Sequence, residues 1–211
     1  MKRFFETNAA KWKSPYGKLH VYIVVPEVVR RYVAEYHDVI RERPALMSVQ
    51  RPEWMHVTVQ LIEAHVADLA PQNLTALKEA LHGSLADLAP FDLTMRPPVM
   101  GVHGVTLRTA YQVPEFTELV NRTRSAVDLV LGADALHPNG ARQRPHASLG
   151  YGLTDGDSDP ILGAVNALNA DRDPVTFTVD QVALLAVDQD PEEGIYTWKV
   201  LDTIDLTAPA P

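Results

Sequence analysis

The sequence contains no cysteine, and this absence excludes several kinds of chemistry together. Without thiols the chain has no disulfide bonds, no thiolate nucleophile and no cysteine ligands for zinc. No apolar run approaches the roughly 20 residues that span a bilayer. A signal peptide requires an apolar run after its basic residues, and no such run follows Lys2 and Arg3. We therefore expect a soluble protein of the reducing cytoplasm, with no membrane partner.

Several signature motifs of enzymes are missing as well. There is no Gly-x-Ser-x-Gly elbow, no His-Glu-x-x-His pair, no Walker loop and no Gly-x-Gly-x-x-Gly loop. The formal net charge of −8 argues against a protein that grips a long nucleic-acid duplex through many phosphates. The eight histidines are not paired at ligand spacing on one helix or strand. We expect no metal and no cofactor; the alternative is a metal site whose ligands come from distant elements. A small nucleotide in a local cationic pocket is compatible with this charge.

What the chain does contain is a short motif that occurs twice, 90 residues apart. His56 and Thr58 lie in a run that alternates polar and apolar residues, and His146 and Ser148 lie in a second run typical of a strand. Residues i and i+2 of a strand point to one face, so each motif presents an imidazole beside a hydroxyl. A regular strand also places Gln60 on the face of His56. Two such pairs facing each other suit chemistry at a phosphate group, because they supply an acid, a base and two hydroxyl donors.

A third match to this pattern, at His82 and Ser84, lies in a different setting. Leucines recur around it at helical spacing, which predicts a helix over 72–88. Residues two apart on a helix project about 200° away from each other. His82 and Ser84 therefore cannot converge on one ligand, and we interpret His82 as a residue of the helix surface.

The two strand motifs belong to a faint internal repeat. In each copy an apolar strand leads into Pro-Glu, at 26–27 and at 114–115, and an amphipathic helix follows. Proline suits the first helical turn, and an acidic residue there complements the helix dipole. A Gln-Arg-Pro triplet then precedes each histidine motif, at 50–52 and at 143–145. The repeat predicts two related lobes.

The pattern of elements predicts an α+β fold, with two pseudo-symmetric lobes of mostly antiparallel sheet, outer helices and a cleft between the lobes. We divide the chain into an N-terminal extension (1–18), a bilobal domain (19–205) and a disordered tail (206–211). The expected strands are 19–25, 54–63, 91–100, 103–112, 144–152, 174–187 and 195–205, and the expected helices are 27–42, 72–88, 115–131 and 159–169.

The N-terminal extension is locally basic and rich in aromatic residues. Two interpretations are open: a flap over a substrate, or a peripheral extension that is packed down by its aromatic side chains. The residues concerned are Lys2, Arg3, Phe4, Phe5, Lys11, Trp12, Lys13, Tyr16 and Lys18.

These motifs and their flanking elements resemble those of the two-histidine (2H) phosphoesterases, which include bacterial RNA 2′,5′-ligase-like proteins and plant cyclic phosphodiesterases. The mark of that family is a pair of His-x-Thr/Ser-x motifs on strands from two pseudo-symmetric lobes, here at 56–59 and 146–149. The resemblance covers residues 19–205. Most ligase-like members carry an arginine five residues after the second histidine, where this chain has Tyr151. The chain therefore looks closer to the cyclic phosphodiesterase type.

The resemblance implies a metal-independent phosphodiesterase that hydrolyses 2′,3′-cyclic phosphates of nucleotides or RNA ends to 2′-phosphates. It also implies that His56 is the acid and His146 the base, although the sequence itself does not assign these roles. Thr58 and Ser148 would donate hydrogen bonds to phosphate oxygens. The alternatives are an RNA 2′,5′-ligase and a nucleotide- or RNA-binding module without turnover. A binding module has no need of two proton-transfer groups.

Three further residues are candidate substrate contacts. Tyr22 matches a family position where an aromatic residue lines the cleft, and Tyr151 reaches the ligand if a bulge turns it inward; either is equally compatible with the core. Arg144, two residues before His146, is a candidate phosphate contact, with an exposed surface role as the alternative. The expected partner is a small nucleotide or an RNA terminus, bound by a monomer.

Overall fold

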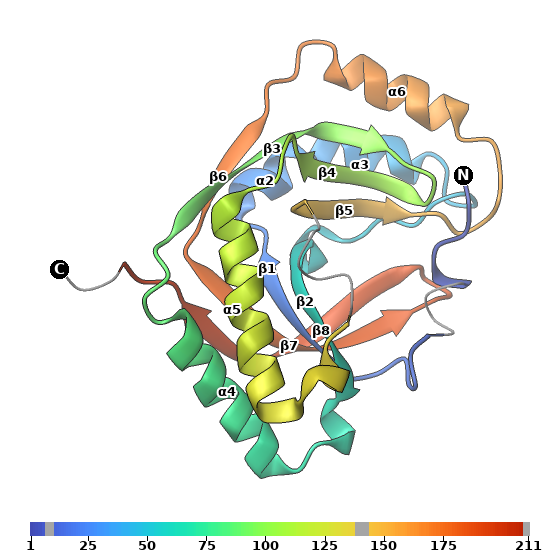
Figure 1. The fold of residues 1–211 in the computed structure, drawn as a ribbon. Helices are drawn as coiled ribbons and strands as arrows, with labels where there is room; N and C mark the ends of the chain where they lie inside the picture. Colours follow the sequence, from blue (N-terminus) through green and yellow to red (C-terminus); the bar gives the residue numbers. More distant parts are fainter. Residues whose placement is uncertain (7–10, 138–143, 209–211) are drawn as a thin grey trace.

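A single curved sheet organises the molecule (Figure 1). The computed structural model describes residues 1–6, 11–137 and 144–208. Within these residues eight strands pair antiparallel in the order β6-β3-β4-β5-β2-β1-β7-β8. The strands are β1 (Lys18–Val24), β2 (His56–His65), β3 (Phe91–Met100), β4 (Gly104–Thr109), β5 (His146–Tyr151), β6 (Val175–Val179), β7 (Gln181–Asp190) and β8 (Ile195–Asp205).

The strand order divides the sheet into two halves, β6-β3-β4-β5 and β2-β1-β7-β8, which meet between β5 and β2. Each half contains one strand of the predicted repeat that carries a histidine motif. The α+β fold with two related lobes of antiparallel sheet is therefore confirmed.

One expected strand, 174–187, is wrong because the chain changes lobes within it. β6 ends at Val179 and pairs with β3, whereas β7 begins at Gln181 and pairs with β1 in the other half. Asp180 lies at the crossing point, and its carbonyl oxygen accepts a hydrogen bond from the amide of Leu206 at 2.7 Å. The strand-like pattern of 174–187 is interrupted by Asp180 and Gln181, but a local pattern does not show with which strand each half pairs.

The helices cover one face of the sheet. α4 and α5 pack on each other and against β8 and β2, while α3 and α6 pack on each other and against β5 and β3 (Figure 1). The expected helix 27–42 is two helices that meet at Val33, a fully buried residue with φ −94° and ψ 0°. The helices are α2 (Glu27–Tyr32), α3 (Ala34–Arg41), α4 (Pro71–Leu85), α5 (Pro114–Leu131) and α6 (Asp159–Asn169).

Two hydrophobic clusters occupy the two faces of the sheet. The larger one lies under the helices and takes Leu19, Val21 and Ile23 from β1. The smaller one is mostly aromatic and takes Tyr22 from the same strand, together with rings from β5, β8 and the N-terminal residues. Because side chains alternate along a strand, β1 contributes to both clusters. The face without helices is the one on which a site can open.

The chain ends add two observations. No helix in the described ranges is long and apolar enough to cross a bilayer. Of the tail predicted at 206–211, residues 209–211 lie outside the described residues, as does Gln143 of the second Gln-Arg-Pro triplet. Leu206 is buried beside the larger cluster.

Candidate active site

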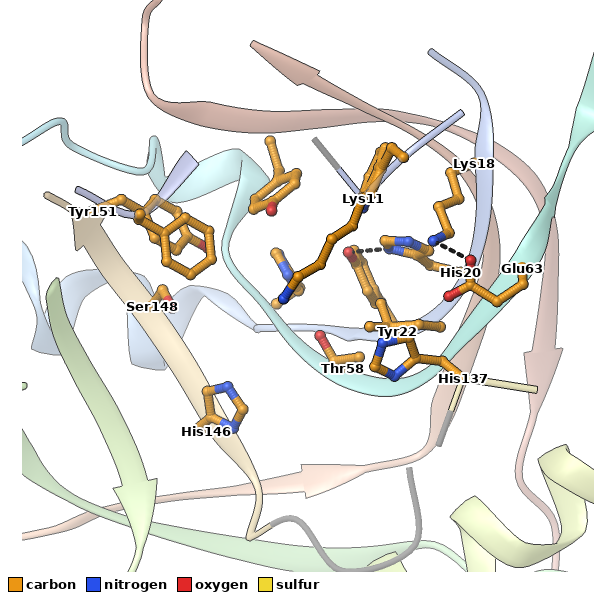
Figure 2. Close-up of a pocket in the computed structure, with 15 residues that line it drawn as sticks. Lys11, Lys18, His20, Tyr22, Thr58, Glu63, His137, His146, Ser148 and Tyr151 are labelled. Atoms are coloured by element: carbon orange, nitrogen blue, oxygen red, sulfur yellow. Dashed lines mark hydrogen bonds and ion pairs between the residues drawn. The ribbon is translucent and has the colours of Figure 1, made fainter. Parts of the chain in front are cut away.

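The two histidine motifs meet at the centre of the sheet, on the neighbouring strands β2 and β5. Their register pairs Val57 with Ala147, which are the residues between histidine and hydroxyl in each motif. In an antiparallel pair, this register sets each histidine across from the hydroxyl residue of the other motif, on one face. One cavity of about 280 Å³ is lined by all four side chains, His56, Thr58, His146 and Ser148. Figure 2 labels the last three.

Each histidine is held by the same kind of hydrogen bond. Nδ1 of His56 lies 3.1 Å from the carbonyl oxygen of Trp54, and Nδ1 of His146 lies 3.2 Å from that of Arg144. A carbonyl oxygen only accepts, so Nδ1 is the donor in both rings. In a neutral imidazole this leaves Nε2 without a proton. Both rings therefore keep Nε2 as the atom available to a ligand.

A bulge follows the hydroxyl residue in β2. Val21 of β1 pairs with Gln60, but the next residue, Tyr22, pairs with Thr58, so Val59 is the extra residue. A bulge reverses the alternation of side chains beyond it. Gln60 is accordingly fully buried away from the cavity, and its Oε1 accepts a hydrogen bond from Arg124 at 3.0 Å. The expectation that Gln60 shares the face of His56 is wrong.

A matching bulge follows the hydroxyl residue in β5. Val105 of β4 pairs with Gly150 and Thr106 pairs with Ser148, which leaves Leu149 as the extra residue. The bulge brings Tyr151 to the cavity beside Ser148. Burial raises the pKa of Tyr151 to about 12, while a hydrogen bond with Ser148 acts in the opposite direction. Tyr151 is therefore a neutral phenol at physiological pH.

Tyr22 lies directly against one histidine of the pair. Its ring stacks on the His56 imidazole with centroids 3.9 Å apart and planes 8° apart. Its hydroxyl forms a hydrogen bond with Nδ1 of His20. Burial raises the pKa of Tyr22 well above its usual value, whereas a hydrogen bond with Thr58 lowers it. Tyr22 thus fixes the plane of His56 and contacts the neighbouring hydroxyl.

Arg144 does not reach the cavity with its side chain. It is exposed, and its Nη1 donates a hydrogen bond to the carbonyl oxygen of Ala110 at 2.9 Å. Arg144 contributes to the site through its backbone carbonyl oxygen, which accepts a hydrogen bond from Nδ1 of His146. The structure thus places the Arg144 side chain on the surface, outside the residues that line the cavity.

The protonation of His56 is set mainly by its burial. Loss of solvent lowers the pKa of His56 to about 4, although the hydrogen bond to Trp54 acts in the opposite direction. His56 is therefore neutral at neutral pH in the free protein. An anion bound beside the ring stabilises the imidazolium and raises this pKa.

Sequence reasoning missed the other end of the cavity, which is formed by the first strand and its neighbours. Lys18 and His20 precede Tyr22 at intervals of two on β1 and face the cavity with it. Nζ of Lys18 lies 2.7 Å from Oε2 of Glu63 on β2. Burial lowers the pKa of His20 well below its usual value, and the charge of Lys18 adds to this effect. The alternation of polar and apolar residues over 18–23 is the signal by which this face could have been found.

The N-terminal residues and the last strand complete the wall of the cavity. Phe4, Lys11 and Trp12 line it from the N-terminal side, and Tyr196 lines it from β8. Phe4 lies against Tyr151 with ring centroids 4.5 Å apart. The N-terminal residues therefore pack by their aromatic rings, as one of the two interpretations expects, and they also border the cavity. Among the residues that the structure describes, no group of three or more His, Asp or Glu side chains is placed to hold a metal.

Comparisons with known proteins bear on the same residues. The model of a family described as the 2′-5′ RNA ligase superfamily matches residues 19–191. A search of curated proteins finds no match. The crystal structure of TT0787 of Thermus thermophilus is similar with a TM-score of 0.68 and 19% identity, over 92% of this chain and 100% of that one. That of E. coli LigT complexed with 3′-AMP is similar with a TM-score of 0.66 and 15% identity, over 91% and 99%. At these identities the likeness to solved structures is one of fold.

Proposed function

The chain belongs to the 2′-5′ RNA ligase superfamily, a group of two-histidine phosphoesterases, and from this premise we propose that it hydrolyses 2′,3′-cyclic phosphates of nucleotides or RNA ends to 2′-phosphates without a metal ion. The observation that carries the proposal is the register of β2 and β5 at Val57 and Ala147. It sets two imidazoles and two hydroxyls around one cavity of nucleotide size.

The chemistry follows from the atoms that the two rings leave available. One Nε2 accepts a proton from water as the water oxygen forms a bond to phosphorus. The other ring, protonated at Nε2, gives its proton to the ribose 3′-oxygen as the bond from that oxygen to phosphorus breaks. Each such transfer is worth about 10²–10⁴-fold in rate. Thr58 and Ser148 donate hydrogen bonds to the non-bridging oxygens. Hydrogen bonds to these charged oxygens are stronger than hydrogen bonds between neutral groups.

The size of the cavity favours hydrolysis over the joining of two RNA ends. Its volume of about 280 Å³ lies just below the range of small-molecule sites, about 300–1,000 Å³, and suits one nucleotide. Aromatic rings along its wall offer faces on which a base can stack: Phe4, Trp12, Tyr151 and Tyr196. E. coli LigT has been crystallised with 3′-AMP and with ATP, which are single nucleotides.

Incubation with a panel of phosphodiesters in EDTA tests this function. We expect 2′,3′-cyclic nucleotides and RNA with a cyclic-phosphate end to be opened to 2′-phosphates, and 3′,5′-cyclic nucleotides to be left intact. Phosphorus NMR distinguishes the 2′-product from the 3′-product. A 2′,5′-joined product in the presence of a 5′-hydroxyl RNA, without hydrolysis, would support the ligase instead. Binding without turnover would identify a binding module, and loss of activity in EDTA would contradict the metal-free mechanism.

Protonation of His56 should depend on the bound phosphate. Its pKa is about 4 in the free protein, and we assign it the role of proton donor because a phosphate anion beside the ring favours the imidazolium. We expect the NMR titration of the His56 ring to move to higher pH when 2′-AMP is bound, and to stay near 4 with adenosine. Because the complex then binds more protons than the free protein, this contribution to affinity should fall as pH rises through the new pKa. An unmoved titration would instead make His56 the acceptor and His146 the donor.

A further inference from the structure

The N-terminal segment, residues 1–6 and 11–18, lies outside the residues 19–191 that match the family, yet it borders the cavity. We propose that Lys11 of this segment binds the reacting phosphate, so that a cation supplied from outside the family-matched chain completes the site. The proposal rests on the proposed function for the identity of the phosphate, but the binding of a phosphate by Lys11 does not depend on turnover.

The rest of the cavity compensates the charge of a phosphate only in part. Among the described residues that line it, the other lysine is Lys18, whose side chain is 4% exposed and is paired with Glu63 at 2.7 Å. In the free protein, burial keeps His20 and His56 neutral by lowering the pKa of each. The Lys18–Glu63 pair sums to zero charge, so the imidazolium of the proton donor is the positive charge that this part of the lining offers a phosphate, and a further cation would strengthen binding. A cation held near the developing charge is the usual means by which such transition states are stabilised.

Lys11 is in the position to supply that charge. Its side chain extends from the rim into the cavity, with the ammonium directed toward the space between Ser148, Thr58 and His146 (Figure 2). Within the described part of the chain, no carboxylate lies within ion-pair distance of its Nζ. Lys13, two residues further on, instead forms an ion pair with Asp68 at 2.9 Å on the outer surface.

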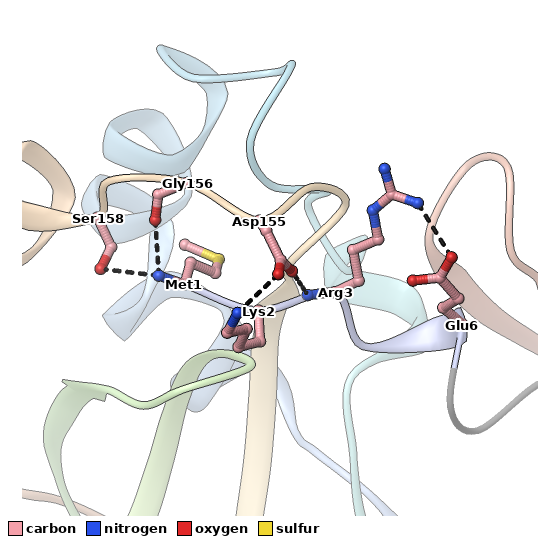
Figure 3. A network of polar contacts seen from close by, with 7 residues as sticks. All are labelled: Met1, Lys2, Arg3, Glu6, Asp155, Gly156 and Ser158. Atoms are coloured by element: carbon pink, nitrogen blue, oxygen red, sulfur yellow. Dashed lines mark hydrogen bonds and ion pairs between the residues drawn. The ribbon is translucent and has the colours of Figure 1, made fainter.

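The first residues of the segment are tied to the loop after β5 (Figure 3). The amine of Met1 donates to the carbonyl oxygen of Gly156 at 2.7 Å. Nζ of Lys2 and the amide of Arg3 both bind Asp155, at 2.7 and 3.0 Å. This end of the segment is therefore held beside the strand that carries His146.

The residues after Lys11 are tied to the other half of the sheet. The carbonyl oxygen of Ser14 accepts from Nε2 of His65 at 3.0 Å, and that of Pro15 accepts from the amide of Gln189 at 2.8 Å. The Trp12 ring packs edge-on against His20, with centroids 5.3 Å apart. Since the segment is anchored on both halves of the sheet, Lys11 is positioned by the fold and does not behave as a loose terminal lysine.

The experiment compares Lys11→Ala with Lys13→Ala and Lys11→Arg. Calorimetry gives the Kd for 2′-AMP, inorganic phosphate and adenosine, and kcat/KM is measured with 2′,3′-cyclic AMP. We expect Lys11→Ala to weaken binding of 2′-AMP and phosphate about 10- to 100-fold, as for loss of a charged hydrogen bond, and to leave adenosine unchanged. Lys11→Arg should restore most of the affinity, and Lys13→Ala should match the parent protein. The difference in Kd for 2′-AMP between Lys11→Ala and the parent protein should shrink as salt is added.

Four outcomes would overturn the proposal, three of them in the variants and one in the parent protein. The first is an unchanged Kd for 2′-AMP in Lys11→Ala. The second is an equal loss of affinity for adenosine and 2′-AMP in that variant, which would mean that Lys11 only packs the wall. The third is an equal loss of affinity for 2′-AMP in Lys13→Ala. A parent protein that binds neither 2′-AMP nor phosphate would overturn it as well. If the Lys11 effect on 2′-AMP is seen but no cyclic phosphate is opened, the phosphate site stands and the proposed hydrolase activity falls.

Discussion

Replacement of either His56 or His146 by alanine is expected to lower kcat for 2′,3′-cyclic AMP by about 10²–10⁴-fold, since each removes one proton transfer. The double variant should be scarcely slower than either single variant, because a base without its acid does little. Thr58→Ala and Ser148→Ala should each cost less, as each deletes one hydrogen-bond donor and leaves both imidazoles in place. Steady-state kinetics on the purified variants, with circular dichroism to verify folding, measure these effects.

His82→Ala is the matched control for these variants. His82 fits the same sequence pattern but lies half-exposed on α4, where its Nε2 is 3.3 Å from Asp202. It does not border the cavity, so its removal should leave kcat unchanged. A folded His82→Ala protein as inactive as His56→Ala, or full activity in either cavity variant, would reject the two-histidine mechanism.

The second large effect concerns the backbone that holds the second motif. Gly150→Ala should destabilise the protein by at least about 2 kcal/mol, the scale of overpacking a filled interior. A Cβ at Gly150 would lie 2.3 Å from the carbonyl oxygen of Ser48, a backbone atom that cannot rotate aside. The amide of Gln50 in the same stretch donates to Leu149 at 2.9 Å, so the strain reaches the bulge beside Ser148. Urea unfolding followed by fluorescence measures the loss.

Gly83→Ala provides the control for this substitution. Gly83 lies in α4, and a Cβ there meets nothing within 4 Å. Because alanine favours a helix over glycine by up to about 1 kcal/mol, this variant should be as stable as the parent protein or more so. If both glycine variants unfolded at the same urea concentration as the parent, the close packing of β5 against Ser48 would not be a source of stability.

The sequence predicts the paired motifs but not the full face on which they lie. The two-residue period places His56 with Thr58 and His146 with Ser148, because the period is a local property of any strand. The faces on which Gln60 and Tyr151 lie could be predicted only with knowledge of the bulges at Val59 and Leu149. A bulge is defined by the register with a neighbouring strand, which one strand's sequence does not contain.

Two other features depended on contacts between distant parts of the chain. The segment 174–187 has the composition of one long strand, yet β6 and β7 pair in different halves of the sheet. Composition alone left the N-terminal residues as either a packed extension or a flap. The position of Lys11 at the cavity follows from anchors such as Asp155 and Gln189, which are more than 140 residues away in the sequence. Local patterns carry no information about such long-range contacts.

The matching hydrogen bonds of His56 and His146, each to the carbonyl oxygen two residues earlier, have a consequence for the direction of the reaction. By microscopic reversibility, the ring that gives a proton when a phosphate ring opens takes it back when the ring closes or a new ester forms. The matching hydrogen bonds of the two rings therefore carry no preference between cutting and joining. Under the proposed chemistry, the outcome is chosen by which oxygen nucleophile the walls admit: a water molecule or the hydroxyl of a second RNA end. In this chain part of that wall is the N-terminal segment, so the proposed chemistry would separate cleavage from ligation at the entrance to the cavity and not at the histidines.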